Sequence, residues 1–252
     1  MDNSQIWFLG VFSSLIAGLA TTIGAIPVLF LKKQMTEKQM DILLGFAAGV
    51  MLAATMFSLI VPAIDTGGVF ITIIGILVGA IVIDLIDYFS PHEHFLKGKE
   101  GPELIQLKRI WLFVIAIALH NFPEGMAVGV SFGGGMIANG ITVAIAIGLQ
   151  NIPEGTATAF SLIKANYNAK QSFFWTFLTG LVEPLGGLLG ASLVVLMKPA
   201  LPFFLSFAAG AMLYVISDEI IPETHSHSNE RAATFSLIGG FLIMLILDVM
   251  LG

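Results

Sequence analysis

The sequence predicts an all-α integral membrane protein in which eight helices form a bundle. Hydrophobic residues make up 56% of its 252 residues and charged ones only 11%, whereas soluble domains carry about 25% charged residues. The apolar residues fall into eight segments, each near or above the ~20 residues that a helix needs to cross a ~30 Å hydrocarbon core. Membrane β-barrels instead show alternating segments of about ten residues. The expected spans are 5–31, 41–62, 69–89, 109–132, 137–163, 172–197, 201–221 and 233–251.

The short connections between these segments leave no room for a soluble domain, so we expect residues 1–252 to form a single transmembrane domain. The first segment lacks a basic start and is long enough to span, which indicates a retained helix rather than a signal peptide. The absence of cysteine excludes disulfides and thiolate metal sites. A Gly-rich phosphate loop is also missing, which argues against ATP-driven pumping by this chain. We expect lipid around the protein and no nucleic-acid partner.

Basic residues set the expected orientation, because cytoplasmic loops of membrane proteins are enriched in Lys and Arg. With eight spans, all basic residues except Lys198 fall on one side, which places both termini outside. Thr36 and Gln39 form the pattern of a capping box, which predicts a helix start at the second span. The basic residues on the cytoplasmic side are Lys32, Lys33, Lys38, Lys97, Lys99, Lys108, Arg109, Lys164, Lys170 and Arg231.

The second and seventh spans resemble each other. Residues Phe46 to Leu52 read Phe-Ala-Ala-Gly-Val-Met-Leu, and Phe207 to Leu213 read Phe-Ala-Ala-Gly-Ala-Met-Leu. They are five positions apart in the order of spans, so they cross in opposite directions. This favours a 3+2+3 arrangement, in which helices 1–3 and 6–8 are inverted repeats around helices 4–5, as in many secondary transporters. The alternative is a surface of small residues that merely packs helices together.

Two similar polar stretches lie in the middle of the fourth and fifth spans. The first, Leu119 to Gly125, reads Leu-His-Asn-Phe-Pro-Glu-Gly, and the second, Leu149 to Gly155, reads Leu-Gln-Asn-Ile-Pro-Glu-Gly. The first polar residue and the Glu are four apart in each copy, so both face one side of a helix. An ionisable residue at mid-membrane costs at least ~2.5 kcal/mol and therefore indicates a functional site.

These stretches and the sixth span supply metal ligands at one depth. His120 and Glu124 come from the first copy, Gln150 and Glu154 from the second, and Glu183 from the sixth span. Imidazole, carboxylate and amide ligands without thiolate suit Zn²⁺ and neighbouring divalent ions rather than Cu(I), whereas Mg²⁺ prefers oxygen ligands and keeps its waters.

Each copy also contains a proline directly before the Glu and a glycine directly after it. Pro123 and Pro153 lack a backbone N–H, so each leaves one helix carbonyl free. Gly125 and Gly155 would let neighbouring helices approach closely.

Several other interpretations of the polar cluster stay open. It could be a static hydrogen-bond network between helices, although three carboxylates at one depth would repel one another without a cation or protons. The cluster could also belong to a proton-coupled carrier of another small solute, but nothing basic lies at midplane to meet an anion. An intramembrane metalloenzyme is a further alternative, but the H-E-x-x-H signature is absent. We expect no enzymatic activity.

The motifs H-N-x-P-E-G, Q-N-x-P-E-G and, in the sixth span, E-P-L-G-G resemble those of the ZIP (Zrt/Irt-like) family of divalent-metal transporters, most closely its bacterial branch. The likeness covers nearly the whole chain. It implies transport of Zn²⁺, and also of Cd²⁺, Fe²⁺ or Mn²⁺, into the cytoplasm by alternating access, with the metal as substrate and no cofactor. The resemblance also implies a bacterial inner-membrane location, and a homodimer is plausible.

The resemblance assigns roles to the polar residues. His120, Glu124, Gln150 and Glu154 would hold the transported ion. Many family members have His where this chain has Gln150, which is a weaker, neutral ligand, and some bacterial ones have Asp in place of Asn151. The residues that would complete an adjoining second metal position are Asn121, Asn151 and Glu183.

Other acids in the spans gather near the two predicted mouths, where they would attract cations. The resemblance suggests that Met51 and Ser58 line the path on the outer side, although Met51 could equally be a packing or lipid-facing residue. The acids at the outer ends are Asp65 and Asp248, and those toward the cytoplasm are Asp84, Asp87, Asp218 and Glu219.

The remaining histidines all lie in predicted cytoplasmic loops. Short His-rich tracts bind metal weakly, so these could receive ions that leave the path. Solvated histidines without a role are an equal alternative. The histidines concerned are His92, His94, His225 and His227.

Overall fold

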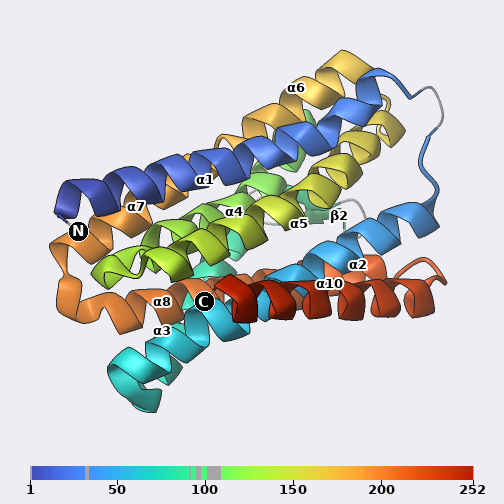
Figure 1. Ribbon diagram of the computed structural model, residues 1–252. Helices are drawn as coiled ribbons and strands as arrows, with labels where there is room; N and C mark the ends of the chain where they lie inside the picture. Colours follow the sequence, from blue (N-terminus) through green and yellow to red (C-terminus); the bar gives the residue numbers. More distant parts are fainter. Residues whose placement is uncertain (1, 32–33, 91, 95–97, 101–108, 252) are drawn as a thin grey trace.

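The computed structural model describes residues 2–31, 34–90, 92–94, 98–100 and 109–251, and Figure 1 shows that helices dominate these residues. The long helices run roughly side by side in one bundle. The α-helices are α1 (Asn3–Ala25), α2 (Glu37–Ala53), α3 (Val61–Phe89), α4 (Arg109–Ser131), α5 (Ile137–Lys164), α6 (Ala169–Gly180), α7 (Glu183–Leu196), α8 (Leu201–Val215), α9 (Ile221–Thr224) and α10 (Glu230–Leu251). Shorter segments are η1 (Ile26–Leu29), η2 (Ala54–Ile60), η3 (Gly133–Gly135), η4 (Lys198–Ala200) and η5 (Ile216–Ile220).

Six stretches of the described helices are long and apolar enough to cross a membrane, which agrees with an integral membrane helical bundle. One of them, residues 37–89, contains two of the spans expected from the sequence. The helix α5 is not among the six, because the polar residues of its central motif lower its mean hydropathy. The stretches are Asn3–Leu29, Glu37–Phe89, Val114–Ser131, Ala169–Leu196, Lys198–Thr224 and Glu230–Leu251.

The ends of the helices follow local chemistry. Thr36 caps α2: its hydroxyl oxygen accepts from the Gln39 backbone N–H at 3.3 Å, and its own N–H donates to Gln39 Oε1 at 3.0 Å. The predicted capping box is therefore confirmed. Asp2 and Gln5 form another at α1, where hydrogen bonds from Ser4 and Gln5 hold the pKa of the Asp2 carboxyl below its usual value.

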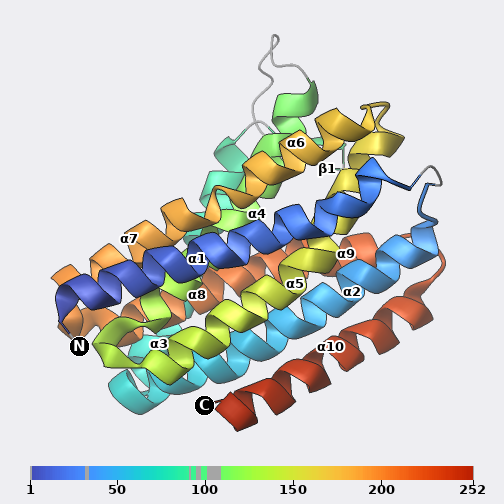
Figure 2. The same ribbon diagram turned by 45° about the horizontal axis from the view of Figure 1, so that its top comes forward.

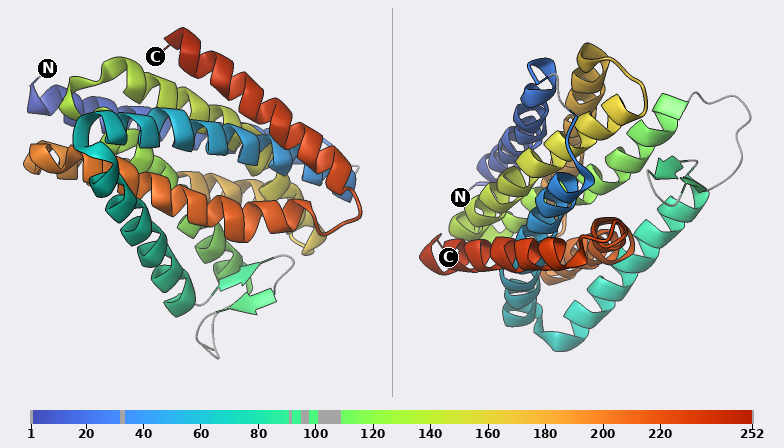
Figure 3. Two further views of the ribbon diagram at one scale, coloured as in Figure 1. Left: turned by 90° about the horizontal axis from the view of Figure 1, so that it is seen from below. Right: turned by 90° about the vertical axis from the view of Figure 1, so that its right-hand side faces the viewer.

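The chain reverses direction at Gly68, where the left-handed φ of 78° interrupts the helical backbone. Glycine adopts this conformation without the steric cost that a Cβ imposes. Beyond this turn α3 folds back and packs along α8 (Figure 3). Gly79 lies there against the backbone of Phe207. The sequence placed the break between residues 62 and 69, and the turn falls within that interval.

Both chain termini lie at one end of the bundle, whereas the α1–α2 and α9–α10 connections lie at the other (Figure 2). This is the separation expected from the basic residues, four of which, Lys32, Lys33, Lys97 and Lys108, lie outside the described residues.

The long connection after α3 contains a two-stranded antiparallel sheet that the sequence pattern did not indicate. Its strands are β1 (His92–His94) and β2 (Gly98–Glu100), with Glu93 opposite Lys99. Alternation over three residues is too short to be recognised as a strand.

The predicted sixth span is broken into α6 and α7. The break at Leu181 and Val182 makes Glu183 the first residue of α7, followed by Pro184, which is favourable in a first helical turn because it lacks an N–H. The helix N-terminus carries partial positive charge, so this position suits a carboxylate.

Both members of the predicted repeat continue into π-helical turns. The helix α2 passes into η2, and α8 passes into η5. Each π segment ends two residues before a proline, Pro62 in the first case and Pro222 in the second. The likeness between the two regions therefore extends beyond the Phe-Ala-Ala-Gly sequence itself.

Candidate metal centre

The two polar motifs, on α4 and α5, meet Glu183 of α7 at a place where these three helices and α1 pack closely together. A Cβ at Gly125 would lie 1.9 Å from the Glu183 carbonyl oxygen, and one at Gly155 would lie 2.1 Å from that of Thr21. The expectation that these glycines permit close helix contacts is therefore confirmed. Close packing leaves the polar side chains almost without solvent contact: Asn121, Glu124, Gln150, Asn151 and Glu183 are at most 1% exposed, and Glu154 is 8% exposed.

Amide side chains connect the helices at this point. Asn151 Nδ2 donates to the Ala17 carbonyl at 2.8 Å and to Glu183 Oε1 at 2.6 Å, while its Oδ1 accepts from Gln150 Nε2 at 2.5 Å. Asn121 Nδ2 donates to the Thr179 carbonyl at 3.1 Å. Both asparagines thus present their N–H groups to neighbouring helices.

Many oxygen atoms here have no hydrogen-bond partner among the described residues. A buried polar atom without a partner costs free energy and commonly marks a place for water or an ion. A set of carboxylate and amide oxygens beside an imidazole fits a divalent cation such as Zn²⁺. The atoms are Glu124 Oε1 and Oε2, Glu154 Oε2, Gln150 Oε1, Asn121 Oδ1 and Glu183 Oε2.

His120 faces Glu219 of η5. Its Nε2 lies 2.5 Å from Glu219 Oε2, and its Nδ1 lies 2.8 Å from the Ala116 carbonyl oxygen. A carbonyl oxygen only accepts, so Nδ1 carries a proton, and a further proton lies between Nε2 and the Glu219 carboxylate. Nε2 must lose that proton before it can bind a metal ion. Glu219, expected at the cytoplasmic mouth, therefore lies against the central histidine. Its π-helical turn is a feature often found at functional sites.

In the part of the chain that the structure describes, no group of three or more His, Asp or Glu side chains is placed to hold one metal ion. The imidazole of His120 meets Glu219 instead. The ligand set of His120, Glu124, Gln150 and Glu154 stays a prediction, and it requires His120 to turn away from Glu219.

On the predicted outer side, Ser58 and Asp248 are partners. The Ser58 hydroxyl on η2 donates to Asp248 Oδ1 on α10 at 2.5 Å. Met51 is 1% exposed and packs in the main hydrophobic core, which excludes the lipid-facing alternative for this residue. Asp65 is exposed near the Gly68 turn and does not share the Ser58–Asp248 contact.

The acids expected toward the cytoplasm are dispersed. Asp84 is exposed and accepts a hydrogen bond from the Tyr214 hydroxyl at 3.1 Å, whereas Asp87 is buried on the next turn of α3. Asp218 is half-buried beside Glu219 in η5. Of these four acids, Glu219 is the one whose carboxylate pairs with the imidazole of His120 in the described part of the chain.

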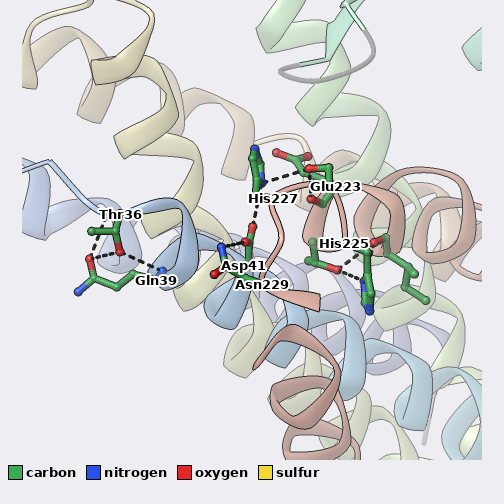
Figure 4. Close-up of polar contacts among 10 residues, drawn as sticks. Thr36, Gln39, Asp41, Glu223, His225, His227 and Asn229 are labelled. Atoms are coloured by element: carbon green, nitrogen blue, oxygen red, sulfur yellow. Dashed lines mark hydrogen bonds and ion pairs between the residues drawn. The ribbon is translucent and has the colours of Figure 1, made fainter. Parts of the chain in front are cut away.

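Two loop histidines take part in local hydrogen bonds at the α9–α10 connection (Figure 4). His227 Nδ1 lies 3.2 Å from Asp41 Oδ1, and Asn229 Nδ2 donates to Asp41 Oδ2 at 3.0 Å. His225 lies 3.0 Å from both the Ile221 carbonyl and the Thr234 hydroxyl. His92 and His94 lie on β1, and their side chains are outside the described part of the structure.

Sequence reasoning missed Asp41 and Glu223. Asp41 is 1% exposed although it lies in the second turn of α2, and Glu223 lies in α9, directly before the connection that carries His227. Asp41 is the first residue of the second predicted span. Its position, an acid at the start of an apolar segment, is the sequence feature that could have identified it. Their proximity to loop residues depends on the return of the chain through η5 and α9, which sequence spacing does not reveal.

Replacing Asp41 by Ala is expected to lower the free energy of unfolding by about 1 kcal/mol, because His227 and Asn229 lose their shared acceptor. Thermal unfolding in detergent measures the change. Asp65→Ala removes an exposed carboxylate and should leave the unfolding temperature unchanged. Equal effects of the two variants on the unfolding temperature would show that the hydrogen bonds of Asp41 do not stabilise the protein.

Comparison with known proteins identifies the family and several similar chains. The family described as ZIP zinc transporter matches residues 90–248. The zinc transporter ZIPB of Bordetella bronchiseptica is 41% identical over 245 residues, which cover 92% of this chain and 78% of the relative. GufA of Myxococcus xanthus, also named a zinc transporter, is 41% identical over 252 residues, covering 96% and 99% of the two chains. ZupT of Chlorobaculum parvum, another zinc transporter by name, is 39% identical over 251 residues, covering 92% and 93%.

Proposed function

The chain belongs to the ZIP zinc transporter family, and on that premise we propose that it carries Zn²⁺ into the cytoplasm by alternating access. Zn²⁺ is the substrate, and His120, Glu124, Gln150 and Glu154 hold it halfway across the bilayer. The observation that carries this proposal is the group of buried oxygens without partners on α4 and α5. In a static network these oxygens would accept hydrogen bonds, whereas a transport site must leave them available to an ion.

The proposed path runs through two sets of polar side chains. Ser58 and Asp248 form its outer part, with Asp65 at the mouth and Met51 between them and the centre. Glu219 receives the ion from His120, because it already contacts the imidazole Nε2. The acids nearest the cytoplasm are Asp84, Asp87 and Asp218.

The proposed alternating access requires eight crossings in a 3+2+3 arrangement. Equivalent helix contacts in the two proposed repeats support this arrangement. A Cβ at Gly49 would lie 1.9 Å from the Leu237 carbonyl oxygen, and one at Gly210 would lie 2.1 Å from that of Ile76. In the first contact α2 presents a glycine to α10. In the second, α8, the counterpart of α2 in the predicted repeat, presents a glycine to α3. The reciprocal contacts join the same pairs of helices: Gly240 of α10 lies against Phe46 of α2, and Gly79 of α3 lies against Phe207 of α8.

The central helices obey the same relation. Gly155 of α5 lies against Thr21 of α1, and Gly125 of α4 lies against Glu183 of α7. Under the proposed pseudo-symmetry α1 would correspond to α7 and α5 to α4, as two inverted repeats around a central pair require. Movement of one repeat relative to the other would expose the centre to each side in turn.

We further propose that both termini face the outside of a bacterial inner membrane. Because the chain has no cysteine, single cysteines can report this orientation. A membrane-impermeant maleimide applied to intact cells is expected to label Lys198→Cys, on the exposed α7–α8 connection, but not Ser228→Cys, on the α9–α10 connection. Labelling of both variants after permeabilisation is the control. The reverse pattern in intact cells would contradict the orientation.

Zinc uptake into proteoliposomes that contain a zinc-sensitive dye tests the proposed function. The native chain is expected to raise uptake well above that of protein-free liposomes, and the same assay with Cd²⁺, Fe²⁺ and Mn²⁺ defines selectivity. Absence of uptake for every divalent ion, with the protein folded and under either pH gradient, would exclude metal transport. A proton-coupled carrier or an intramembrane metalloenzyme would then be the better interpretation. The homodimer stays a prediction from the sequence.

A further inference from the structure

The side-chain amide of Asn151 is fixed by three hydrogen bonds in the centre. Both N–H bonds of Nδ2 are used, one toward Ala17 and the other toward Glu183, and Oδ1 accepts from Gln150. Asn151, Gln150 and Glu183 are all fully buried, so water does not compete for these contacts.

The orientation of this amide follows from its surroundings. The Ala17 carbonyl and the Glu183 carboxylate face the same end of Asn151, and both only accept hydrogen bonds. Rotating the amide by half a turn would place its oxygen against two other oxygens. Asn151 therefore presents N–H groups, with their partial positive charge, to the carboxylate of Glu183.

A cation bound at this place would also satisfy the Ala17 carbonyl and Glu183 Oε1. We propose that Asn151 substitutes for a second cation, so that the centre of this chain takes one transported ion rather than two. The ion lies beside Glu124, Gln150 and Glu154, where the oxygens have no partners among the described residues. Asn151 thereby determines the metal stoichiometry of the site, an inference that rests on the proposed function.

Replacing Asn151 by Asp exchanges the Nδ2 donor for a carboxylate oxygen, with almost no change in the shape of the side chain. Acceptor oxygens of the introduced carboxylate, of Glu183 and of the Ala17 carbonyl would then face one another without an N–H between them. A buried cluster of acceptors requires a cation or a proton. Asn151→Asp should therefore create a second divalent-metal position next to the first.

Zinc stoichiometry in the full chain, measured by equilibrium dialysis in detergent, tests the inference. We expect one tightly bound ion in the native chain and one additional ion in Asn151→Asp. Asn139→Asp adds the same charge near the start of α5, outside the centre, and should bind the native number. Weak binding to loop histidines affects all three proteins equally and cancels in the comparison.

Zinc X-ray absorption of the same samples supplies a second measurement, because ions in a two-metal site lie about 3.5–4 Å apart. A zinc–zinc distance of this size is expected only in Asn151→Asp. Its presence in the native chain would overturn the inference even if the variant failed to fold, and a folded variant that gains no ion would also overturn it. Native zinc uptake with two central ions would refute the inference alone, whereas one bound ion without uptake would refute only the proposed function.

Discussion

Glu124→Gln is expected to reduce Zn²⁺ uptake by at least about 100-fold, because even changes to residues that only support a metal ligand cost 10–100-fold. The substitution removes the charge and one oxygen of a proposed ligand while keeping the shape of the side chain. Neither oxygen of Glu124 has a hydrogen-bond partner among the described residues. Removing a buried charge of this kind should leave stability unchanged or increase it.

Opposite effects on uptake and stability distinguish a transport ligand from a structural residue. Proteoliposome flux and metal-free thermal unfolding are measured on the same preparation. Glu37→Gln, an exposed change at the start of α2, serves as the control and should alter neither quantity. If Glu124→Gln destabilised the fold and kept its zinc uptake, the carboxylate would be a structural element.

Gly240→Ala is expected to destabilise the protein by about 1–3 kcal/mol, the usual cost of overpacking, whereas Gly239→Ala should not destabilise it. Both glycines lie in α10 and gain the same helix propensity on replacement. A Cβ at Gly240 would lie 2.2 Å from the Phe46 backbone oxygen, but one at Gly239 would meet no described atom within 4 Å. Thermal unfolding in detergent measures the difference.

Thermal unfolding also tests whether the two proposed repeats are structurally equivalent. Gly79 occupies the position that corresponds to Gly240, and its Cβ would lie 2.0 Å from the Phe207 backbone oxygen. Gly79→Ala should therefore destabilise the protein as much as Gly240→Ala does. A loss confined to one half of the molecule would argue against structurally equivalent repeats.

The positions of the long helices could be predicted because burial in lipid imposes one requirement, a sufficient length of apolar chain. The span expected at 109–132 is α4, Arg109–Ser131, and that expected at 233–251 lies within α10. Local signals were equally reliable where the interaction is local, as at Thr36 and Gln39. The central motifs could be recognised because polar residues are conspicuous in an apolar helix.

Contacts between distant parts of the chain could not be predicted in this way. The π-helical turn of η5 changes the direction of Glu219, and this turn brings the carboxylate to His120 rather than to the mouth. The break before Glu183 depends on how α6 and α7 pack, since Pro184 alone would also fit a continuous kinked helix. Asp41 likewise gains its partners only when the α9–α10 connection returns to α2.

The most direct test of a zinc path through the centre is anomalous X-ray scattering at the zinc edge from crystals of the native chain grown with Zn²⁺. A zinc path through the centre predicts a peak about 2.0–2.2 Å from carboxylate oxygens of Glu124 and Glu154, the usual zinc–oxygen distance. A single peak there, within bonding distance of His120 Nε2 as well, would also show that the imidazole leaves Glu219. Zinc bound only at His225 and His227, with none in the centre at saturating metal, would contradict the account.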